Sequence, residues 1–274
     1  MCGRYAASRH QDQLVEIFEV DEVVEPGPTG PNQKPYTAPR WNIAPTDQVA
    51  AIVERAHKAD DQTTSRDTIR KLVGLTWGLV PSWSKAPTGG AKLINARLET
   101  VAEKPSFRKA FTSRRCLIPA DGYYEWYASP NAPKSARKQP FYIHPTGSGA
   151  PAGSAGIDTP LMVMAGLYEF WRDPARDKDD PLAWLTTCAI ITTAATDDLG
   201  RIHDRMPVQV RPEHWDAWLD PTLADADAAL GLVHVPDAGE MTAHAVSRLV
   251  STVSNDGPEL VEPMPAERVE GEES

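Results

Sequence analysis

Long apolar runs are absent from this chain of 274 residues. No stretch approaches the roughly 18–20 apolar residues of a membrane span, and no charged-then-apolar leader precedes a cleavage site. Apolar residues still make up 41% of the chain, enough for a substantial core. We therefore expect a folded, cytoplasmic protein that has no membrane partner.

Cysteine is scarce as well. The three cysteines, Cys2, Cys116 and Cys188, are unevenly spaced and form no CxxC pair, so they offer no disulfide framework and agree with a reducing compartment. The seven histidines show no metal-ligand spacing with cysteine. Walker, GxGxxG, GxSxG and HExxH motifs are also missing. The sequence predicts no metal and no cofactor.

An excess of positive charge is the third absence. The formal net charge is −10, which counts against DNA binding because phosphate affinity comes mainly from Lys and Arg. The acidic residues, however, concentrate in segments 177–180, 220–227 and 259–272, away from the motifs in which basic residues cluster. A basic channel on an acidic body is one interpretation, and an ordinary solvated surface is the other.

Strand patterns dominate what the sequence does contain. Strands are predicted at residues 48–55, 72–75, 116–119, 139–144, 161–168, 183–192 and 242–250. The polar segment 56–68 suggests an enlarged hairpin, and helices are predicted at 11–18, 98–110, 212–219 and within 220–231. Because hairpins rather than regular helix crossovers join the strands, the predicted class is α+β, with a mainly antiparallel, barrel-like sheet flanked by short helices.

The beginning of the chain, Met1-Cys2-Gly3-Arg4, carries unusual chemistry. A small residue at position 2 allows methionine aminopeptidase to remove Met1, which leaves Cys2 with a free α-amine. That amine has a pKa of about 7.7–8.0 and the thiol about 8.5, so both are partly nucleophilic near neutral pH. Together they can capture one aldehyde, the amine as a Schiff base and the thiol by closing a thiazolidine. The alternative is that Cys2 only opens a buried strand.

Six blocks follow one another along the chain: Met1-Cys2-Gly3-Arg4, Trp41-Asn42-Ile43-Ala44-Pro45, Trp77-Gly78-Leu79-Val80-Pro81-Ser82-Trp83, Asn95-Ala96-Arg97-Leu98-Glu99-Thr100, Pro119-Ala120-Asp121-Gly122-Tyr123-Tyr124-Glu125-Trp126 and Ile202-His203-Asp204-Arg205-Met206-Pro207. In this order they closely resemble the SRAP family, the SOS response-associated peptidase or abasic-site processing proteins. The resemblance implies a single SRAP-like domain over residues 2–255, before an acidic tail over 256–274 that we expect to be disordered. It also implies a monomeric enzyme that cross-links itself to abasic sites in single-stranded DNA during the DNA damage response.

The family's functional residues map onto Cys2, Asn95, Glu125 and His203. Aromatic neighbours raise the pKa of a carboxyl by desolvation, which equips Glu125 to move protons while the sugar ring opens. His203 can shuttle a proton near neutral pH, with Asp204 to orient it, and Asn95 offers a donor and an acceptor. The structural alternatives are an Arg-paired strand Glu, a loop His and a helix-capping Asn.

DNA contacts are expected from fixed charges and flat rings. Arg4, Arg97 and Arg205 can grip phosphates, although each could instead form a structural salt bridge. Trp41, Trp77, Trp83 and Trp126, with Pro45, are candidates for stacking on bases or wedging them apart. Core packing is the usual fate of tryptophan, and about half of these four are expected to be buried.

Two other functions use the same residues. In a thiol peptidase or amidase, including self-removal of Met1, the Cys2 thiolate attacks a carbonyl with His203 as the base. A non-catalytic reader of modified DNA bases needs the Trp and Arg residues but no free amine on Cys2. An aldehyde-bearing DNA and a peptide analogue distinguish these hypotheses.

Overall fold

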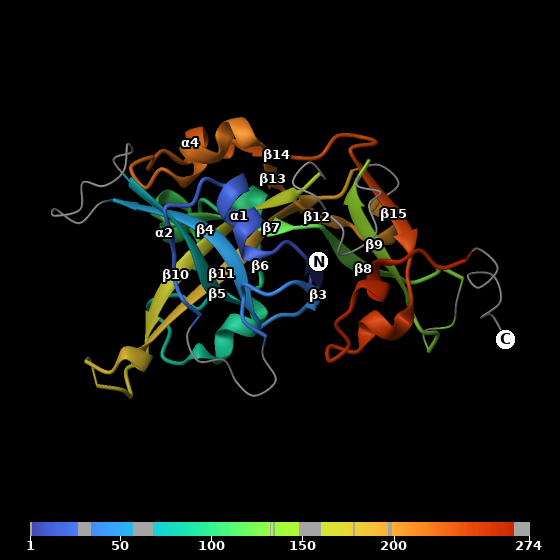
Figure 1. Cartoon of the computed structure of the whole chain (residues 1–274), viewed down its shortest axis with the longest axis horizontal. Helices are drawn as coiled ribbons and strands as arrows, with labels where there is room; N and C mark the ends of the chain where they lie inside the picture. Colours follow the sequence, from blue (N-terminus) through green and yellow to red (C-terminus); the bar gives the residue numbers. More distant parts are fainter. Residues whose placement is uncertain are drawn as a thin grey trace.

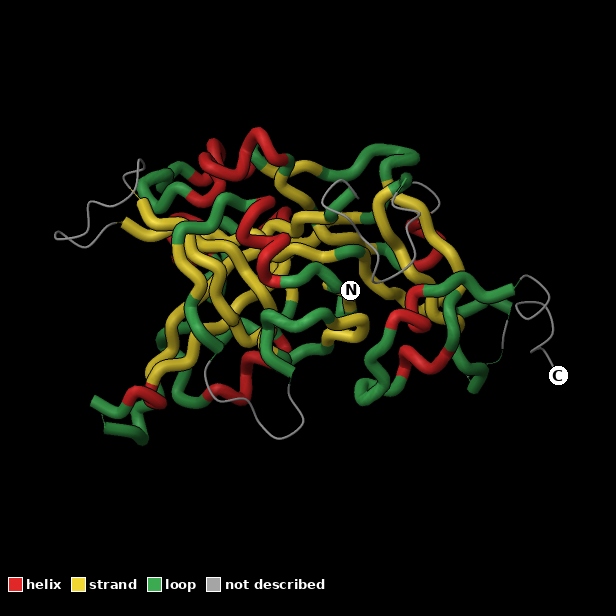
Figure 2. The backbone as a smooth tube through the Cα atoms, in the orientation of Figure 1, coloured by secondary structure: helices red, strands yellow, loops and turns green. Residues whose placement is uncertain are grey.

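The computed structural model describes residues 2–26, 34–56, 68–131, 133, 135–147, 160–177, 179–196 and 199–265, and all structural statements below concern these residues. Strands form the body of the molecule, and short helices lie around it (Figure 2). No helix in the described ranges is long and apolar enough to cross a membrane.

A closed barrel forms the larger part of the fold. Its strands pair in the order β11-β5-β4-β7-β10, and β10 pairs with β11 to close the ring. Neighbouring strands are antiparallel, except that β5 and β11 are parallel. The barrel strands are β4 (Gln48–Ala56), β5 (Thr68–Trp77), β7 (Arg115–Ala120), β10 (Met162–Arg172) and β11 (Trp184–Ala194).

A second sheet lies beside the barrel, on the other side of the molecule in Figure 1. Its order is β15-β9-β8-β1-β3, and all its pairings are antiparallel. The strands are β1 (Tyr5–Ala7), β3 (Arg40–Ile43), β8 (Gly122–Tyr127), β9 (Gln139–Pro145) and β15 (Met241–Ala245). Since β8 begins two residues after β7 ends, the chain passes directly from the barrel into this sheet.

Short elements extend these two sheets. The added strands are β2 (Glu22–Val23), β6 (Asn95–Arg97), β12 (Arg205–Pro207), β13 (Gln209–Val210) and β14 (Val233–His234). The α-helices are α1 (Gln11–Ile17), α2 (Arg108–Ser113), α3 (Leu199–Ile202), α4 (Trp215–Leu219) and α5 (Ala226–Leu230). The 3-10 helices are η1 (Pro87–Lys92), η2 (Leu98–Thr100), η3 (Pro181–Ala183), η4 (Pro212–His214), η5 (Arg248–Ser251) and η6 (Pro258–Val261).

Side-chain alternation along β4 separates two hydrophobic cores. Val49, Ala51 and Val53 belong to the cluster inside the barrel, whereas Ala50 and Ile52 belong to the cluster on its outer face. Successive side chains of a strand point to opposite faces, so one strand contributes to both clusters. Residues of α1, α2, α4 and α5 complete the outer cluster, which explains how short helices cover the barrel.

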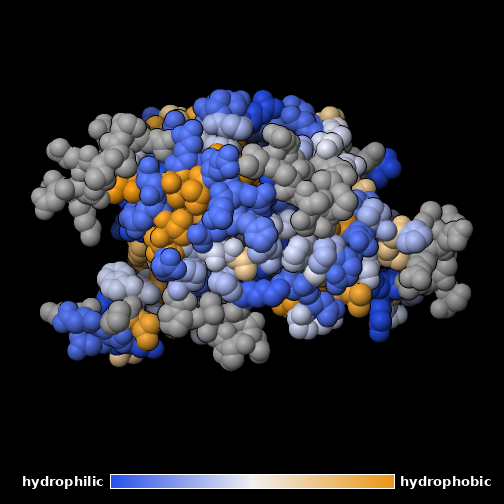
Figure 3. Space-filling view, in the orientation of Figure 1, coloured by the Kyte–Doolittle hydropathy of each residue, from blue (hydrophilic) through white to orange (hydrophobic). Residues whose placement is uncertain are grey.

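The face seen in Figure 3 is mostly hydrophilic, with an apolar patch over β4 and β10. A pocket at the inner face of the barrel is lined by residues of β4, β5, β10 and β11, among them Val53, Val73 and Phe170. The guanidinium of Arg55 lies 4.6 Å from the centre of the Phe170 ring. This cation–π contact places a positive charge in the lining of the pocket.

The predicted fold class, α+β with a mainly antiparallel, barrel-like core, is confirmed. The predicted hairpin is present as well, since β4 and β5 pair from Gln48↔Thr76 to Ala56↔Thr68. Residues 57–67 of its connection lie outside the described residues.

The helix predicted at 98–110 is wrong. The segment contains η2, then a series of turns, and α2 begins only at Arg108. Pro105 explains the break, because proline has no N–H to donate and keeps the residue before it away from the helical conformation. The strand predicted at 242–250 likewise ends at Ala245, and η5 follows.

The tail predicted from residue 256 also needs correction. Asp256 accepts a hydrogen bond of 2.5 Å from the Trp41 backbone N–H. Leu260 in η6 is fully buried with Tyr124 and Val246. One apolar side chain thus anchors a segment whose composition is otherwise acidic, and the boundary at 255 does not hold for residues 256–265. Residues 266–274 lie outside the described residues.

Candidate functional site

Cys2 lies at the end of the barrel core. Its side chain is fully buried, in the same cluster as Tyr5, Trp77 and Tyr123. Burial raises the pKa of the Cys2 thiol far above its usual value, and the negative charge of Glu125 raises it further; the positive amino terminus and the Arg4 backbone N–H oppose this. The thiol is therefore protonated at neutral pH.

Asn95 reaches Cys2 from a different part of the chain. It begins β6, whose parallel pairing with β11 places Asn95 opposite Ile190. Its Nδ2 donates a hydrogen bond of 2.8 Å to the Cys2 carbonyl oxygen. Its Oδ1 is buried and accepts no hydrogen bond from the described residues. Asn95 thus holds the backbone of the nucleophile and keeps one acceptor for a substrate group.

Glu125 approaches from β8, where it pairs with Phe141 of β9. Its side chain is buried, with the residue only 4% exposed. This burial raises the pKa of the Glu125 carboxyl, while the amino terminus and His203 pull it down. A carboxyl with a raised pKa can both donate and accept a proton near neutrality.

His203 directly follows α3 and completes the group. Its Nδ1 lies 4.0 Å from Glu125 Oε1 and 3.0 Å from Asp204 Oδ1. The Arg205 backbone N–H donates to the same Nδ1 at 3.1 Å. A neutral ring that accepts at Nδ1 carries its proton on Nε2. With 29% of its side chain exposed, His203 connects the buried carboxyl to solvent.

The four predicted catalytic residues are therefore brought together from β6, β8, α3 and the start of the chain. Of the structural alternatives, Asn95 caps no helix, because it lies in a strand and bonds to Cys2. The charged groups that lower the pKa of Glu125 are the amino terminus and the His203 imidazole, whose Nδ1 lies 4.0 Å from the carboxylate.

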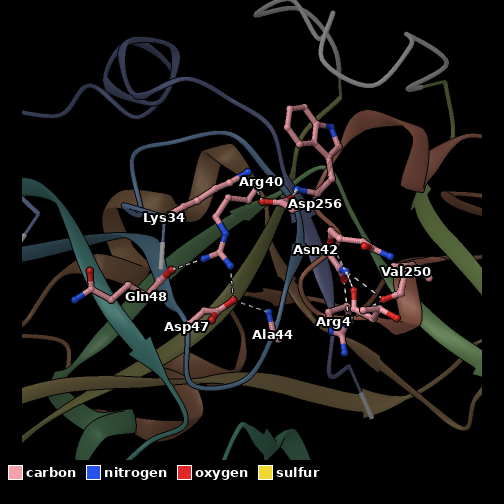
Figure 4. Close-up of polar contacts among 12 residues, drawn as sticks. Arg4, Lys34, Arg40, Asn42, Ala44, Asp47, Gln48, Val250 and Asp256 are labelled. Atoms are coloured by element: carbon pink, nitrogen blue, oxygen red, sulfur yellow. Dashed lines mark hydrogen bonds and ion pairs between the residues drawn. The ribbon is translucent and has the colours of Figure 1, made fainter. Parts of the chain in front are cut away.

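Arg4 is fixed on one edge of its guanidinium. Its Nη1 donates to Asn42 Oδ1 at 2.7 Å and to the Val250 carbonyl at 2.9 Å (Figure 4). The guanidinium also lies 5.6 Å from the centre of the Trp126 ring. Its Nε is buried and donates to no described residue. The guanidinium is therefore held in one orientation, as bidentate phosphate binding requires.

The other two predicted arginines differ. Arg97 is exposed, and no ion pair joins it to a described residue. Arg205 instead forms two bonds to the Glu99 carboxylate, at 2.9 and 3.0 Å, and a third to the Thr192 carbonyl. Only 13% of its side chain is exposed, so in this structure its charge is used in an ion pair, and phosphate binding by Arg205 stays a prediction.

The predicted tryptophans divide in the same way. Trp77 is fully buried, its Nε1 donates to the Ile94 carbonyl, and its ring packs edge-on against Tyr5 at 5.3 Å. The prediction that Trp77 stacks on bases is therefore wrong. Trp83 is 68% exposed, and Trp41 and Trp126 are half-buried.

Asn42 was not predicted from the sequence. It is 1% exposed, and its Nδ2 donates to the carbonyls of Val250, Thr252 and Asn255 at 2.7–3.2 Å. Its Oδ1 accepts from Arg4, so one amide joins the C-terminal segment to that arginine. The sequence signal that could have found Asn42 is its place between the apolar residues Trp41 and Ile43. A polar side chain in such a position is buried with its neighbours and therefore requires hydrogen-bond partners.

The fold and site define a class of protein in which a strand-rich domain buries the cysteine at position 2 and surrounds it with an amide, a carboxyl and an imidazole. The chain belongs to the SOS response associated peptidase (SRAP) family, whose model matches residues 1–253.

Several relatives match over most of this chain. It is 37% identical over 262 residues to the abasic site processing protein YoqW of Bacillus subtilis (strain 168), which covers 96% of this chain and 99% of that protein. It is 30% identical over 269 residues to the abasic site processing protein YedK of Escherichia coli (strain K12), which covers 96% of this chain and 100% of that protein. A crystal structure of a Bacteroides thetaiotaomicron protein matches with a TM-score of 0.69 and 23% identity, over 96% of this chain and 100% of that one, which shows the shared fold.

Proposed function

We propose that this protein is an abasic-site processing protein, which captures abasic sites in single-stranded DNA through Cys2 after Met1 has been removed. The observation that carries the proposal is the convergence of Asn95, Glu125 and His203 around Cys2. The names of the relatives support the substrate class.

Covalent capture of the abasic site proceeds in three steps. Abasic deoxyribose is mostly a closed hemiacetal, so a proton must move from its hydroxyl to the ring oxygen before the C1′ aldehyde appears. The Cys2 amine then adds to that aldehyde, and loss of water leaves a Schiff base. The thiol adds to the same carbon, its proton goes to the nitrogen, and a thiazolidine closes without any oxidant or cofactor.

Each neighbouring residue has a role in these steps. Glu125, with its raised pKa, donates and accepts the protons of ring opening and water loss. His203 moves protons between Glu125 and solvent, since it is near the carboxyl and partly exposed. Asn95 orients Cys2 through its carbonyl and offers its Oδ1 to a sugar hydroxyl or to the thiazolidine nitrogen.

The protonated thiol favours this mechanism over a thiol peptidase. A cysteine nucleophile that attacks a peptide acts as a thiolate, and enzymes lower its pKa for that purpose. Burial raises the pKa of Cys2 instead. In a thiazolidine mechanism the amine attacks first, and the thiol gives up its proton only after the Schiff base has formed close by.

The DNA-binding part of the proposal rests on basic and flat side chains that are exposed or partly exposed. Arg4 is half-buried, with a guanidinium held in place by Asn42 and Val250, and Arg97 is exposed without an ion pair to a described residue. Trp83 offers a ring for stacking, with Trp41, Trp126 and Pro45 partly open. A single strand can bend into such a site, whereas a duplex does not present its sugar C1′. A cytoplasmic location and a monomeric state remain predictions.

A cross-linking assay tests the proposal. Intact mass first establishes whether Met1 is absent. The purified protein is then incubated with single-stranded DNA that carries an abasic site, with the same lesion in a duplex, and with a tetrahydrofuran analogue that has no aldehyde. We expect a heat-stable adduct with the single strand, far less with the duplex and none with the analogue.

Two results would contradict the proposal. If neither lesion-bearing DNA forms an adduct, the proposed function is wrong. If the duplex gives as much adduct as the single strand, the protein does not select single-stranded DNA. A chain that retains Met1 serves as the matched control. If it still formed the stable adduct, the reacting group could not be the Cys2 amine.

A further inference from the structure

Thr46 adopts an unusual backbone conformation next to the candidate site. Its φ is 76°, and it is exposed. Positive φ is a genuine outlier for a β-branched residue. Glu19, the other described non-glycine residue with positive φ, follows the end of α1, where such a conformation is common. Thr46 has no such explanation.

The residue occupies the third position of a tight turn. The Asp47 backbone N–H donates to the Ala44 carbonyl at 3.1 Å, which closes a turn with Pro45 and Thr46 at its centre. Proline followed by a residue with positive φ is the pattern of a type II turn, in which glycine or asparagine normally takes the second of these positions. A threonine here costs conformational energy that glycine would not.

Several bonds hold the turn in this strained form (Figure 4). Asp47 Oδ2 accepts from the Ala44 backbone N–H at 3.0 Å and pairs with Arg40. The Thr46 N–H donates to the Trp77 carbonyl at 2.8 Å, and the Trp77 N–H donates to the Asp47 carbonyl at 2.9 Å. Strain persists only where surrounding structure over-determines it, and it clusters at functional sites.

The turn is also close to the reacting residues. The backbone of Trp77 hydrogen-bonds to the turn. Its ring packs against Tyr5 of β1, and its Nε1 donates to the carbonyl of Ile94, the residue before Asn95. Asp47 is near enough to Arg4 to raise the pKa of that guanidinium, although burial lowers it by more. The turn is thus joined through Trp77 to the core around Cys2, and through β3 and its Asn42 to Arg4.

We propose that Thr46 binds the captured strand, its hydroxyl donating a hydrogen bond to a phosphate oxygen of the DNA next to the lesion. This inference rests on the proposed function. No described residue hydrogen-bonds to the Thr46 hydroxyl, and threonine hydroxyls are regular donors to phosphate. The turn directly follows β3, whose Asn42 accepts a hydrogen bond of 2.7 Å from Arg4, so a DNA strand that binds Arg4 can also reach the Thr46 hydroxyl and be held in one register.

Three substitutions at this position separate the hydroxyl from the backbone strain. Thr46→Val keeps the size and the β-branch but removes the donor, and Thr46→Ser keeps the donor. Thr46→Gly removes the donor and relieves the strain, which outweighs the greater chain entropy of glycine. Affinity is measured by fluorescence anisotropy on unmodified single-stranded DNA, and the rate of adduct formation on abasic DNA at saturation.

We expect Thr46→Val to weaken binding about tenfold, which equals about 1.4 kcal/mol, while its adduct rate at saturating DNA stays within about twofold of wild type. Thr46→Ser should bind within about twofold of wild type. Thr46→Gly should bind as weakly as Thr46→Val and unfold at a temperature no lower than wild type.

The proposal is overturned if Thr46→Val binds like wild type, if Thr46→Ser loses as much affinity as Thr46→Val, or if Thr46→Gly unfolds at a lower temperature. Because the affinity assay uses undamaged DNA, it gives a result even if the wild-type protein forms no adduct. Failure of the covalent chemistry and failure of this contact are therefore distinguishable.

Discussion

Glu125→Gln tests whether a buried carboxyl moves the protons of adduct formation. The carboxyl is 4% exposed, so water cannot readily replace it, while His203 at 4.0 Å can take over part of its work. General acid–base help contributes about 10²–10⁴-fold, and these two facts together favour a loss of about 10³-fold, or about 4 kcal/mol of barrier. The rate is measured by quenched-flow gel analysis at saturating single-stranded abasic DNA.

The pH dependence provides a second readout. Burial raises the pKa of Glu125 above its usual value of 4.5, so at a given pH a larger fraction of this carboxyl is protonated than in a free glutamate. The wild-type rate should fall as pH rises through this elevated pKa, and the glutamine variant should lose that limb of the profile. A simple aldehyde that needs no ring opening should be affected least.

Glu125→Gln should lower the rate of adduct formation but not the stability of the fold. Because burial raises the pKa of Glu125 in the folded state, the ionised carboxylate opposes folding fully above this raised pKa, and the penalty shrinks to zero as pH falls from the raised pKa to the usual one. Glutamine never ionises. The variant should therefore unfold at a temperature equal to or above wild type near pH 8, with the advantage shrinking toward pH 4.

Glu54→Gln is the matched control, because Glu54 is also buried, at 6% exposed, but is bonded to Arg70 at 2.8 Å. Loss of this charge should destabilise the fold by about 1–3 kcal/mol and leave the adduct rate of the folded protein unchanged. If the Glu125→Gln protein is unfolded, or if it loses as much rate with the open aldehyde as with abasic DNA, then Glu125 has a structural role and does not assist ring opening.

Three further predictions concern neighbouring groups. Cys2→Ser, processed to expose its amine, should give a Schiff base that borohydride traps but no heat-stable adduct; a stable adduct on this variant would exclude the thiazolidine. His203→Ala should slow both formation and reversal of the linkage by about 10²-fold or more, measured by release of labelled DNA, and unchanged reversal would refute its proton transfer. Trp77→Ala should cost about 3–5 kcal/mol of stability because the ring is buried, whereas Trp83→Ala should leave the melting temperature unchanged and weaken single-strand binding by about 1–3 kcal/mol; the reverse pattern would contradict the assignment of the two rings.

The sequence by itself determined the general type of fold and was enough to propose the chemistry. A cysteine at position 2 becomes an aminothiol once Met1 is removed, whatever the fold, and the blocks around Asn95, Glu125 and His203 pointed to residues that the structure places near it. Hairpin-forming segments such as 48–56 and 68–77 could be recognised because strand periodicity is local. The break at Pro105 was readable from the same local rules, although the predicted helix passed over it.

Only the tertiary structure decided which side chains are available. Trp77 and Trp83 belong to one block, yet one is fully buried and the other 68% exposed, because burial depends on strands from distant parts of the chain. Arg205 is paired with Glu99 across more than a hundred residues, and Leu260 anchors a segment that composition alone assigned to a disordered tail. Barrel closure by β10 and β11 and the strained turn at Thr46 likewise could not be predicted from the sequence, because they depend on packing between distant segments. Local sequence sets what a residue can do, whereas packing between remote segments determines whether water, a partner or a substrate can reach it.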